Sequence, residues 1–228
     1  MKYLLVAGAQ LLFTLALYFL GVLIVGTAAF PGAVLWLWVW GKAAALSFSL
    51  RVLAVCFGFA AAYFLYGLSL IFVVGALRIL FRLNLKEGSY PMVCAETARW
   101  ALTNALYLLV TATFMDFILL TPWAALFFRL MGAKLGKNVQ INSKFCADLP
   151  LLEIGDNSVI GGHATVIGHS FERDRLILKK VKIGRNVVIG LNSIVLPGAE
   201  IGDGALVAAA AIVPKGTSVP PGTTYFGK

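Results

Sequence analysis

Residues 183–216 read IGRNVVIGLNSIVLPGAEIGDGALVAAAAIVPKG, and an aliphatic residue returns in this stretch at every sixth position. A period of six fits neither the 3.6-residue turn of an α-helix nor the simple alternation of a β-strand. It is typical of a solenoid, in which each hexad forms a short strand and a turn, with its aliphatic side chain inward and a small residue in the corner. The positions in register are Ile183, Ile189, Val195, Ile201, Val207, Val213, Val219 and Tyr225.

The period also extends toward the N-terminus, from Leu135 to Val166, but it is interrupted twice. Ile141 and Ile154 are thirteen positions apart, one more than two hexads require, so an extra residue must bulge the wall. The second interruption, HSFERDRLILKK at 169–180, is rich in charged side chains that cannot pack inside a solenoid. We therefore expect it to project from one corner as a loop, and loops on a rigid scaffold often carry function.

The rest of the chain differs in composition. The 228 residues are 60% hydrophobic, with a mean hydropathy of +0.89, which indicates a membrane protein. Residues 1–133 contain eight Lys and Arg and three Asp and Glu, whereas residues 134–228 contain eleven and seven. We therefore predict a transmembrane and interfacial helical domain over residues 1–133 and the solenoid domain over residues 134–228.

Two membrane spans are predicted, Leu4–Val25 and Val52–Leu77, because each apolar run is long enough to cross a bilayer. A turn at Phe30-Pro31-Gly32 would separate them. The tryptophans of residues 36–40 would form an interfacial belt between the spans, or would open a longer second helix. The basic side chains that follow the second span place residues 78–86 in the cytoplasm.

A third apolar stretch, Trp100–Leu130, contains Asp116, which is costly to expose to lipid at the centre of a bilayer. We therefore predict a bent or interfacial helical pair, broken around Thr121-Pro122. This arrangement leaves the solenoid on the cytoplasmic side of the inner membrane, whereas a third true span would place it outside. Arg99 and Trp100 are expected to anchor the pair at the interface, and binding of a lipid or donor headgroup is the alternative.

The net charge of +9 does not indicate a nucleic-acid-binding protein, because the basic residues form no single stripe with interleaved aromatic residues. Several of them lie beside apolar segments, where they suit membrane lipids with anionic headgroups. The three cysteines have no spacing typical of a zinc site or a disulfide framework, and the chain has only two histidines. No metal is therefore predicted.

The hexads resemble a known family. LGKNVQI at 135–141, IGDNSVIGGHATV at 154–166 and the stretch from residue 183 look like the left-handed parallel β-helix of hexapeptide-repeat acyltransferases, over about residues 132–228. With ARW at 98–100, CADLPLLEIGD at 146–156 and HSFERDR at 169–175, the chain also resembles the membrane-bound terminal domains of poly-ε-lysine-type peptide synthetases. The resemblance implies a prism with three hexads per coil, a homotrimer with active sites between neighbouring subunits, and an acyl thioester donor such as acetyl-CoA.

His169 is the main candidate for a catalytic residue. It follows Gly168 at the base of the second interruption, and an imidazole can remove a proton from a hydroxyl or amine near neutral pH. In the enzymes that the chain resembles, a histidine at this place in the motif is the general base. A surface histidine that caps a turn is the alternative.

Asp148 lies in the first interruption. The resemblance implies that it orients His169 or holds the acceptor, with help from Asn142, and a solvated turn aspartate is the alternative. Arg173 and Arg175, in the projecting loop, are further candidates for substrate binding.

The donor site is expected on the last coils. In the enzymes that the chain resembles, a row of small residues runs alongside pantetheine and a lysine approaches the nucleotide phosphates. These positions match Ala208, Ala209, Ala210 and Lys215. A regular coil without a ligand is the alternative, and His163 is expected to be an exposed corner residue.

These observations predict an integral-membrane acyltransferase that uses acetyl-CoA and a lipid-linked or amphiphilic acceptor with a hydroxyl or an amine. Two alternatives stay open. One is an amide-forming aminoacyl or peptidyl transferase that uses a carrier-protein thioester, and the other is a non-catalytic membrane-anchored trimeric scaffold.

Overall fold

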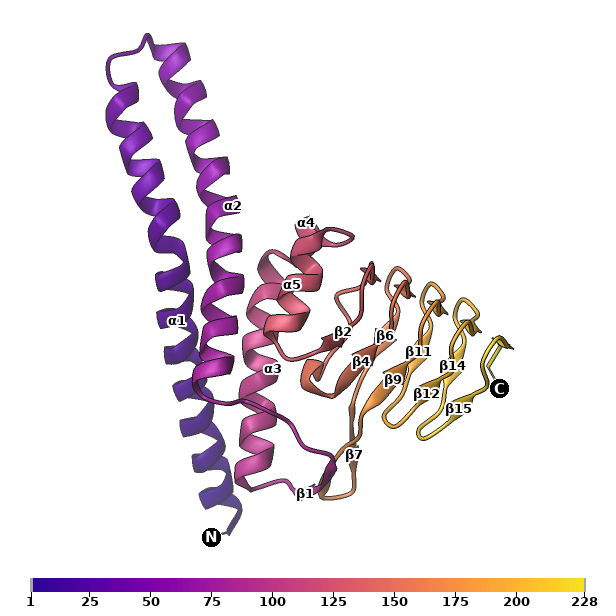
Figure 1. The fold of residues 1–228 in the computed structure, drawn as a ribbon. Coiled ribbons are helices and arrows are strands. Elements are labelled where there is room, and N and C mark those ends of the chain that lie inside the picture. The colour runs from indigo at the N-terminus through magenta and orange to yellow at the C-terminus, as the bar shows by residue number, and fades with distance from the viewer. Residues whose placement is uncertain (1, 228) are drawn as a thin grey trace. The chain divides into compact units, whose positions relative to one another are not determined.

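The computed structural model describes the backbone of residues 2–227 and the side chains of residues 10–227 (Figure 1). The contacts divide the chain into two compact units, residues 1–74 and residues 75–228. The composition changes near residue 133, but residues 75–133 group with the solenoid and not with the first unit.

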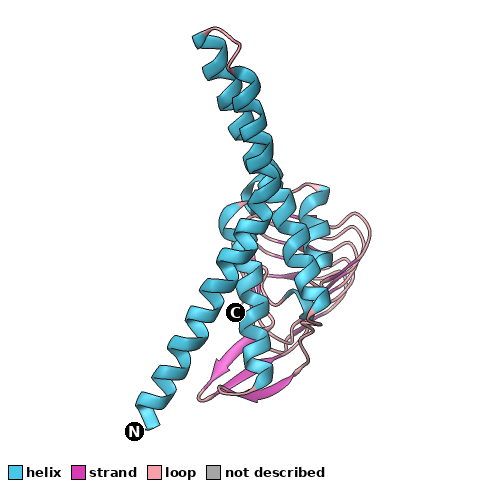
Figure 2. Cartoon of the chain, turned by 90° about the vertical axis from the view of Figure 1, so that its left-hand side faces the viewer, coloured by secondary structure: helices cyan, strands magenta, loops and turns pink. Residues whose placement is uncertain are grey.

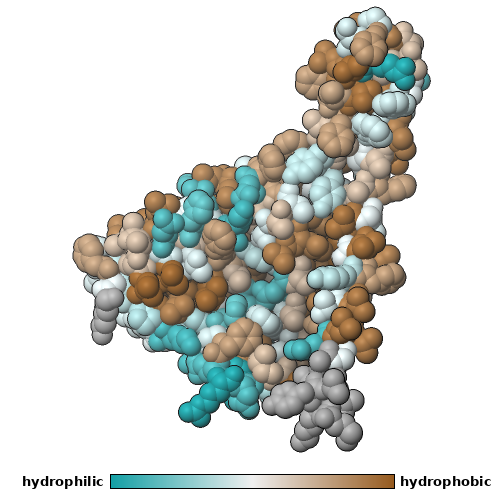
Figure 3. Space-filling model, turned by 180° about the vertical axis from the view of Figure 1, so that it is seen from behind, coloured by the Kyte–Doolittle hydropathy of each residue, from teal (hydrophilic) through white to brown (hydrophobic). Residues whose placement is uncertain are grey.

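The first unit is built from two long helices, α1 (Lys2–Ala43) and the larger part of α2 (Phe48–Leu80), which Figure 2 shows in cyan. Both are long and apolar enough to cross a membrane. Many of their large apolar side chains are exposed, among them Phe19, Phe57 and Phe59, and Figure 3 shows apolar surface on these helices. The two helices therefore expose less polar surface than is usual for helices in contact with water.

The predicted turn at Phe30-Pro31-Gly32 is wrong, because α1 runs through Pro31 without ending. Glycine at position 32 serves a different purpose: a Cβ there would collide with the backbone carbonyl of Ala62, so Gly32 lets α1 and α2 approach closely. The tryptophans of residues 36–40 consequently lie in the last turns of α1, where the rings of Trp36 and Trp40 are 5.6 Å apart.

The second unit begins with a helical layer. After β1 (Gly88–Pro91) come α3 (Ala95–Thr113), α4 (Met115–Ile118) and α5 (Pro122–Leu130). The predicted break at Thr121-Pro122 is confirmed: the Thr121 hydroxyl accepts from Trp123 N, and Pro122 occupies the first turn of α5, where no backbone donor is needed. Phe114, Phe127 and Phe128 are fully buried in this layer.

The solenoid has three faces of parallel strands. Face A comprises β2 (Lys134–Leu135), β4 (Leu152–Ile154), β9 (Val181–Ile183), β12 (Glu200–Ile201) and β15 (Ser218–Val219). Face B comprises β3 (Gln140–Ile141), β5 (Val159–Ile160), β10 (Val188–Ile189), β13 (Leu206–Val207) and β16 (Thr224–Tyr225). Face C comprises β6 (Thr165–Val166), β11 (Ile194–Val195) and β14 (Ile212–Val213).

The strand register confirms three hexads per coil. Val188 pairs with Leu206, eighteen positions later, and Val159 pairs with Val188, twenty-nine positions later, because the second interruption adds eleven residues to that coil. The inward residues Ile189 and Val207 have no exposed surface. The left-handed parallel β-helix predicted from the hexads is therefore confirmed as the fold class of the C-terminal part.

The corners explain the recurrent asparagines and glycines. Asn157, Asn186 and Asn192 have φ values of 57°, 53° and 56°, and Gly216 and Gly222 lie in the same left-handed region. Glycine has no steric penalty in this conformation, and asparagine tolerates it better than most residues do.

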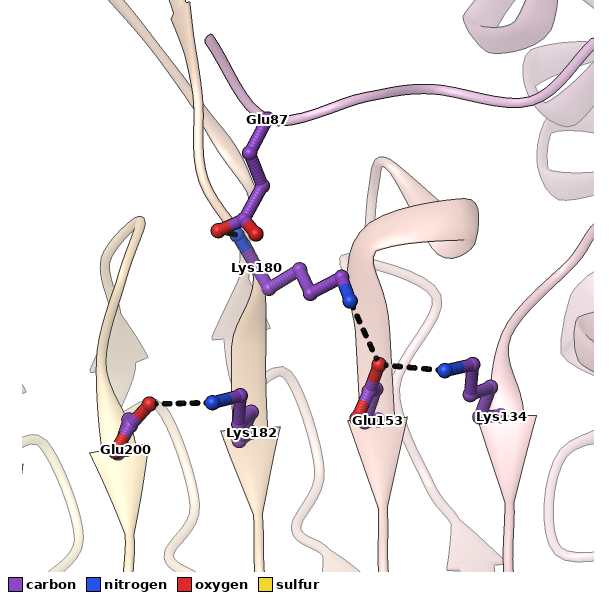
Figure 4. Close-up of polar contacts among 6 residues, drawn as sticks. All are labelled: Glu87, Lys134, Glu153, Lys180, Lys182 and Glu200. Carbon is purple, nitrogen blue, oxygen red and sulfur yellow. Dashed lines mark hydrogen bonds and ion pairs between the residues drawn. The ribbon is translucent and has the colours of Figure 1, made fainter.

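Face A presents charged side chains outward (Figure 4). Lys134 Nζ lies 2.9 Å from Glu153 Oε1, and Lys182 Nζ lies 2.7 Å from Glu200 Oε1, each pair joining adjacent strands. Faces B and C instead present aliphatic residues such as Leu206 and Ile212, which are 40% and 47% exposed. Face A is therefore suited to water, whereas faces B and C have the composition of a contact surface.

Candidate active site

The second interruption forms a β-hairpin rather than a free loop. Strands β7 (His169–Glu172) and β8 (Arg175–Leu178) pair antiparallel, and β1 adds a third strand along β8. The expected projection is correct for residues 171–175, which are exposed. However, Leu176 and Leu178 point inward, where they pack with Leu85 and Leu151.

Arg175 helps to hold this small sheet together. Its guanidinium donates to Ser89 Oγ at 2.6 Å and to the Ser89 carbonyl at 2.7 Å. The neighbouring Lys180 N donates to Glu87 Oε1 at 3.0 Å. Arg175 is thus engaged by β1, whereas Arg173 lies exposed in the left-handed turn of the hairpin.

Asp148 owes its position to the first interruption. Cys146 pairs with Val166 and fills the inward position only five residues after Ile141, so seven residues remain between Cys146 and Ile154. These residues form a wider corner, in which Asp148 has the left-handed values φ 57° and ψ 42° and precedes a short 3₁₀ helix, η1 (Leu149–Leu151). The Asp148 side chain is completely buried, so the alternative of a solvated turn aspartate is wrong.

Four donors surround the Asp148 carboxylate. Oδ1 accepts from Trp100 Nε1 at 2.7 Å and from Asn104 Nδ2 at 3.1 Å. Oδ2 accepts from Gly168 N at 3.0 Å and lies 2.6 Å from His169 Nδ1. A buried carboxylate is stable only with such compensation. Because both oxygens are occupied, the geometry favours orientation of His169 over acceptor binding.

The imidazole ring of His169 is held in place by Asp148 and by two aromatic side chains. Its Nδ1 faces Asp148, and its ring lies 5.0 Å from that of Trp100 and 5.8 Å from that of Phe171. When the carboxylate is ionised and the imidazole neutral, this contact requires the hydrogen on Nδ1 and leaves the lone pair on Nε2. The side chain is 23% exposed. The arrangement can therefore abstract a proton from a bound hydroxyl or amine.

The pair formed by Asp148 and His169, the dyad, has two partners that sequence reasoning missed. Trp100 was expected to anchor the helical layer at the interface, which is wrong because its indole N–H donates to Asp148. Asn104 had no predicted role. Their spacing of four residues places them on one face of α3, and this spacing was the available signal.

Lys215 lies in the same corner of the solenoid as His169, between faces C and A. Ile167 N donates to the Val195 carbonyl, and Gly216 N donates to the Pro197 carbonyl, so successive coils stack along this corner. Lys215 Nζ lies 2.9 Å from Glu172 Oε1 of the hairpin. The hydrogen bond from Lys215 is the main cause that lowers the pKa of Glu172. A hollow of about 810 Å³ lies here, lined in part by Ser170, Lys179 and Lys215.

The other predicted residues lie in the opposite corner of face C, between faces B and C. Asn142 N donates to the Ile160 carbonyl there, and Ala210 N donates to the Leu191 carbonyl. Ala208, Ala209 and Ala210 are therefore not brought together with Lys215 or His169 within one chain. His163 is exposed at this corner, as predicted, and its ring lies 5.9 Å from that of Phe145.

Cys146, two residues before Asp148, is not a nucleophile in this site. Its thiol is fully buried, and burial raises the pKa of Cys146 to about 12. Only the thiolate is a good nucleophile, so the thiol stays inert at neutral pH. Cys146 instead fills the interior of the first coil.

One family model and several solved structures are similar to this chain. The family model "hexapeptide repeat of succinyl-transferase" matches residues 180–214. A solved maltose O-acetyltransferase from Clostridium difficile 630 is 22% identical with a TM-score of 0.49, and the match covers 61% of this chain and 88% of that chain. A hexapeptide-repeat acetyltransferase from Vibrio cholerae, complexed with acetyl coenzyme A, is 21% identical with a TM-score of 0.46, covering 63% and 91%.

A galactoside acetyltransferase in complex with coenzyme A is 21% identical with a TM-score of 0.42, and the match covers 65% of this chain and 84% of that chain. A search of curated protein sequences finds no match. The family-model match over residues 180–214 confirms the predicted resemblance to hexapeptide-repeat proteins for the repeat itself.

Proposed function

We propose that the protein is an acyltransferase in which His169 is the general base and Asp148 orients it. The observation that carries the proposal is the completely buried Asp148 carboxylate, whose Oδ2 lies 2.6 Å from His169 Nδ1. A scaffold without chemistry has no need of a buried carboxylate in strained backbone. An imidazole held in this way suits attack of a hydroxyl or amine on a thioester.

The reaction follows from the dyad. The Nε2 atom of His169 removes the proton from the acceptor as its oxygen or nitrogen attacks the thioester carbonyl carbon. The carbon–sulfur bond then breaks, and the imidazolium returns the proton to the departing thiolate. Throughout, the Asp148 carboxylate stabilises the imidazolium and keeps its Nδ1 hydrogen in place.

The donor is proposed to be acetyl-CoA. Lys215 lies two coils from His169 in the same corner, or about 10 Å along the solenoid axis, since neighbouring strands are about 4.8 Å apart. Its ammonium could pair with a phosphate of the donor in place of Glu172. Arg173, exposed in the hairpin turn, offers a second cation.

A neighbouring copy would complete the site in a homotrimer. Asn142 and Ala208–Ala210 lie in the corner between faces B and C, which is remote from His169 within one chain. Packing of that corner against the His169 corner of the next subunit would bring all of the predicted residues together. The aliphatic outer surfaces of faces B and C support such a contact.

The acceptor is proposed to be lipid-linked or amphiphilic. The two long apolar helices would anchor the protein in the cytoplasmic membrane with the β-helix in the cytoplasm, where acyl thioesters are available. The basic residues beside the apolar segments suit this surface, because it carries anionic lipid headgroups.

The test is transfer of radiolabelled acetyl groups from acetyl-CoA to extracted membrane lipids by the purified full-length protein. His169→Ala should lower the rate by a factor of about 10³, the usual range for loss of a general base being about 10²–10⁴. Asp203→Ala is the control, because Asp203 is exposed at the corner between faces A and B, which lies outside the proposed site.

Each other outcome is informative. Undiminished turnover in His169→Ala would contradict the assignment of the base. Transfer that requires a carrier-protein thioester, without binding of coenzyme A, would replace the donor. Absence of transfer from either donor would leave the trimeric scaffold as the better account.

A further inference from the structure

An apolar hollow lies beside the dyad, between α3 and the widened corner of the first coil. Its volume is about 390 Å³. One wall is formed by Tyr107, Leu108 and Thr111 of α3, and the other by Phe145, Ala147 and Ile167 of the β-helix. The acid–base chemistry of His169 uses none of these side chains.

The hollow lies next to the residues of the Asp148–His169 dyad. Asn104 donates to Asp148, and Leu108 follows one turn later on the same face of α3, about 6 Å along the helix axis. On the opposite wall Ala147 directly precedes Asp148. A molecule that fills the hollow therefore has one end close to the reacting groups.

Three of the four polar side chains that line the hollow, those of Tyr107, Thr111 and Lys144, already have partners within the protein. The Tyr107 hydroxyl donates to the Lys144 carbonyl, and the Thr111 hydroxyl donates to the Tyr107 carbonyl at 3.2 Å. Lys144 Nζ pairs with Asp116 at 2.7 Å. A sugar or nucleotide would lose its hydration here and gain few partners, whereas an alkyl chain gains from burial.

The surroundings of the hollow favour a membrane lipid as the molecule that supplies such an alkyl chain. Leu108 and Phe145, on opposite walls, are 61% and 44% exposed, so the hollow is open to the surface. Phe117 and Leu120 of the same helical layer are also more than half exposed. The chain contains two helices that are apolar enough to span a bilayer, so lipid is the expected neighbour of this layer.

We infer that this hollow binds the alkyl chain of a lipid and holds its hydroxyl or amine head at His169. The lipid is then the acceptor, an assignment that rests on the proposed acyltransferase function. Binding of the chain itself depends only on the hollow. The two statements can therefore be tested separately.

The binding test uses the full-length protein in vesicles of phosphatidylethanolamine and phosphatidylglycerol that contain a phosphatidylglycerol with a diazirine at the end of one acyl chain. After irradiation, mass spectrometry should locate the label on Ala147 and Ile167, which line the hollow. Ala112→Phe, at an exposed position on its wall, should lower this labelling at least fivefold.

Two controls accompany this test. Ala98→Phe changes another exposed alanine of α3, which lies outside the hollow, and should leave the labelling unchanged. The inactive His169→Ala protein should be labelled like the wild type, so a failed transfer reaction does not obscure the result. Labelling that Ala112→Phe leaves unchanged, or crosslinks that join two copies through the hollow, would overturn the inference.

The second test measures acetyl transfer to 1-alkanols and alkylamines, from ethyl to decyl. If the chain enters the hollow, kcat/KM should rise about fourfold for each added methylene group until the hollow is full, as expected for burial of a methylene. Ala112→Phe should remove this gain for the long acceptors and spare the ethyl acceptor. Transfer that does not depend on chain length would contradict an alkyl site, while no transfer to any acceptor would count against the proposed function alone.

Discussion

The coils before and after residue 183 are built from the same hexads but differ in what they bury. Among the described residues from 183 to 227, Ser193 is the only buried polar or charged side chain. The coils before it bury the Asp148 carboxylate, and they also carry the hairpin and the contacts with α3. A strict hexad places one aliphatic side chain inward and leaves no space for a carboxylate with four donors. The proposed chemistry therefore lies where residues have been added to the repeat.

Among the substitutions considered, a change of the buried Asp148 carboxylate should have the largest effect on activity. Asp148→Asn keeps the size of the side chain but removes the acceptor that holds the Nδ1 hydrogen of His169. We expect kcat to fall by a factor of about 10³–10⁴, as for a histidine held in the wrong tautomer. Steady-state kinetics would measure this. Asp203→Asn, at an exposed corner of the regular coils, is the control, and a loss below tenfold in Asp148→Asn would refute the dyad.

Substitutions in the regular coils should change the stability of the protein and not its catalytic activity. Ile189 has no exposed surface, so Ile189→Ala should lower the free energy of unfolding by about 2–5 kcal/mol through loss of packing and a residual cavity. The adjacent Val188 points outward and is 41% exposed, so Val188→Ala should cost much less. Chemical denaturation would distinguish the two. Equal effects would mean that the alternation of inward and outward residues is misassigned.

A smaller effect is expected for the helix that supports the dyad. Asn104→Ala removes one of two donors to Asp148 Oδ1 and leaves Trp100 in place. We expect kcat to fall by a factor of about ten, the equivalent of about 1.4 kcal/mol, with little change in KM. A residue that only stabilised the fold would lower the melting temperature without this change in kcat alone. That outcome would remove Asn104 from the positioning of His169.

The smallest effect is expected on face A. The Lys182–Glu200 pair is exposed, so a double-mutant cycle to alanine should give a coupling free energy close to zero. The nearby Glu153 adds a pH dependence, because the hydrogen bond from Lys134 is the largest cause that lowers its pKa from 4.5. Its small stabilisation is present at neutral pH and is lost as the pH falls below 4.5. Unfolding curves at neutral and acidic pH would reveal it, and a larger coupling would show that face A is shielded from water.

Local patterns were sufficient to predict the solenoid. Hexads repeat over most of residues 134–225, so each strand and corner is specified by nearby residues. The same is true of the break at Thr121-Pro122, where cap and proline are adjacent. His169 and Asp148 could be singled out because they stand at the two interruptions of the repeat. The turn predicted at Pro31 failed because proline alone does not show whether packing against a second helix compensates for the lost hydrogen bond.

The sequence by itself therefore determined the repeat, the long apolar helices and the two positions at which the site forms. The tertiary structure alone decided that Trp100 and Asn104 reach Asp148 across more than forty residues, and that β1 joins the hairpin across more than eighty. It also separated Ala208–Ala210 from Lys215 by the width of face C. The physical reason is that a period reports which way each residue faces within its own element. The partner of a buried polar group depends on how distant elements pack, and no local pattern records this.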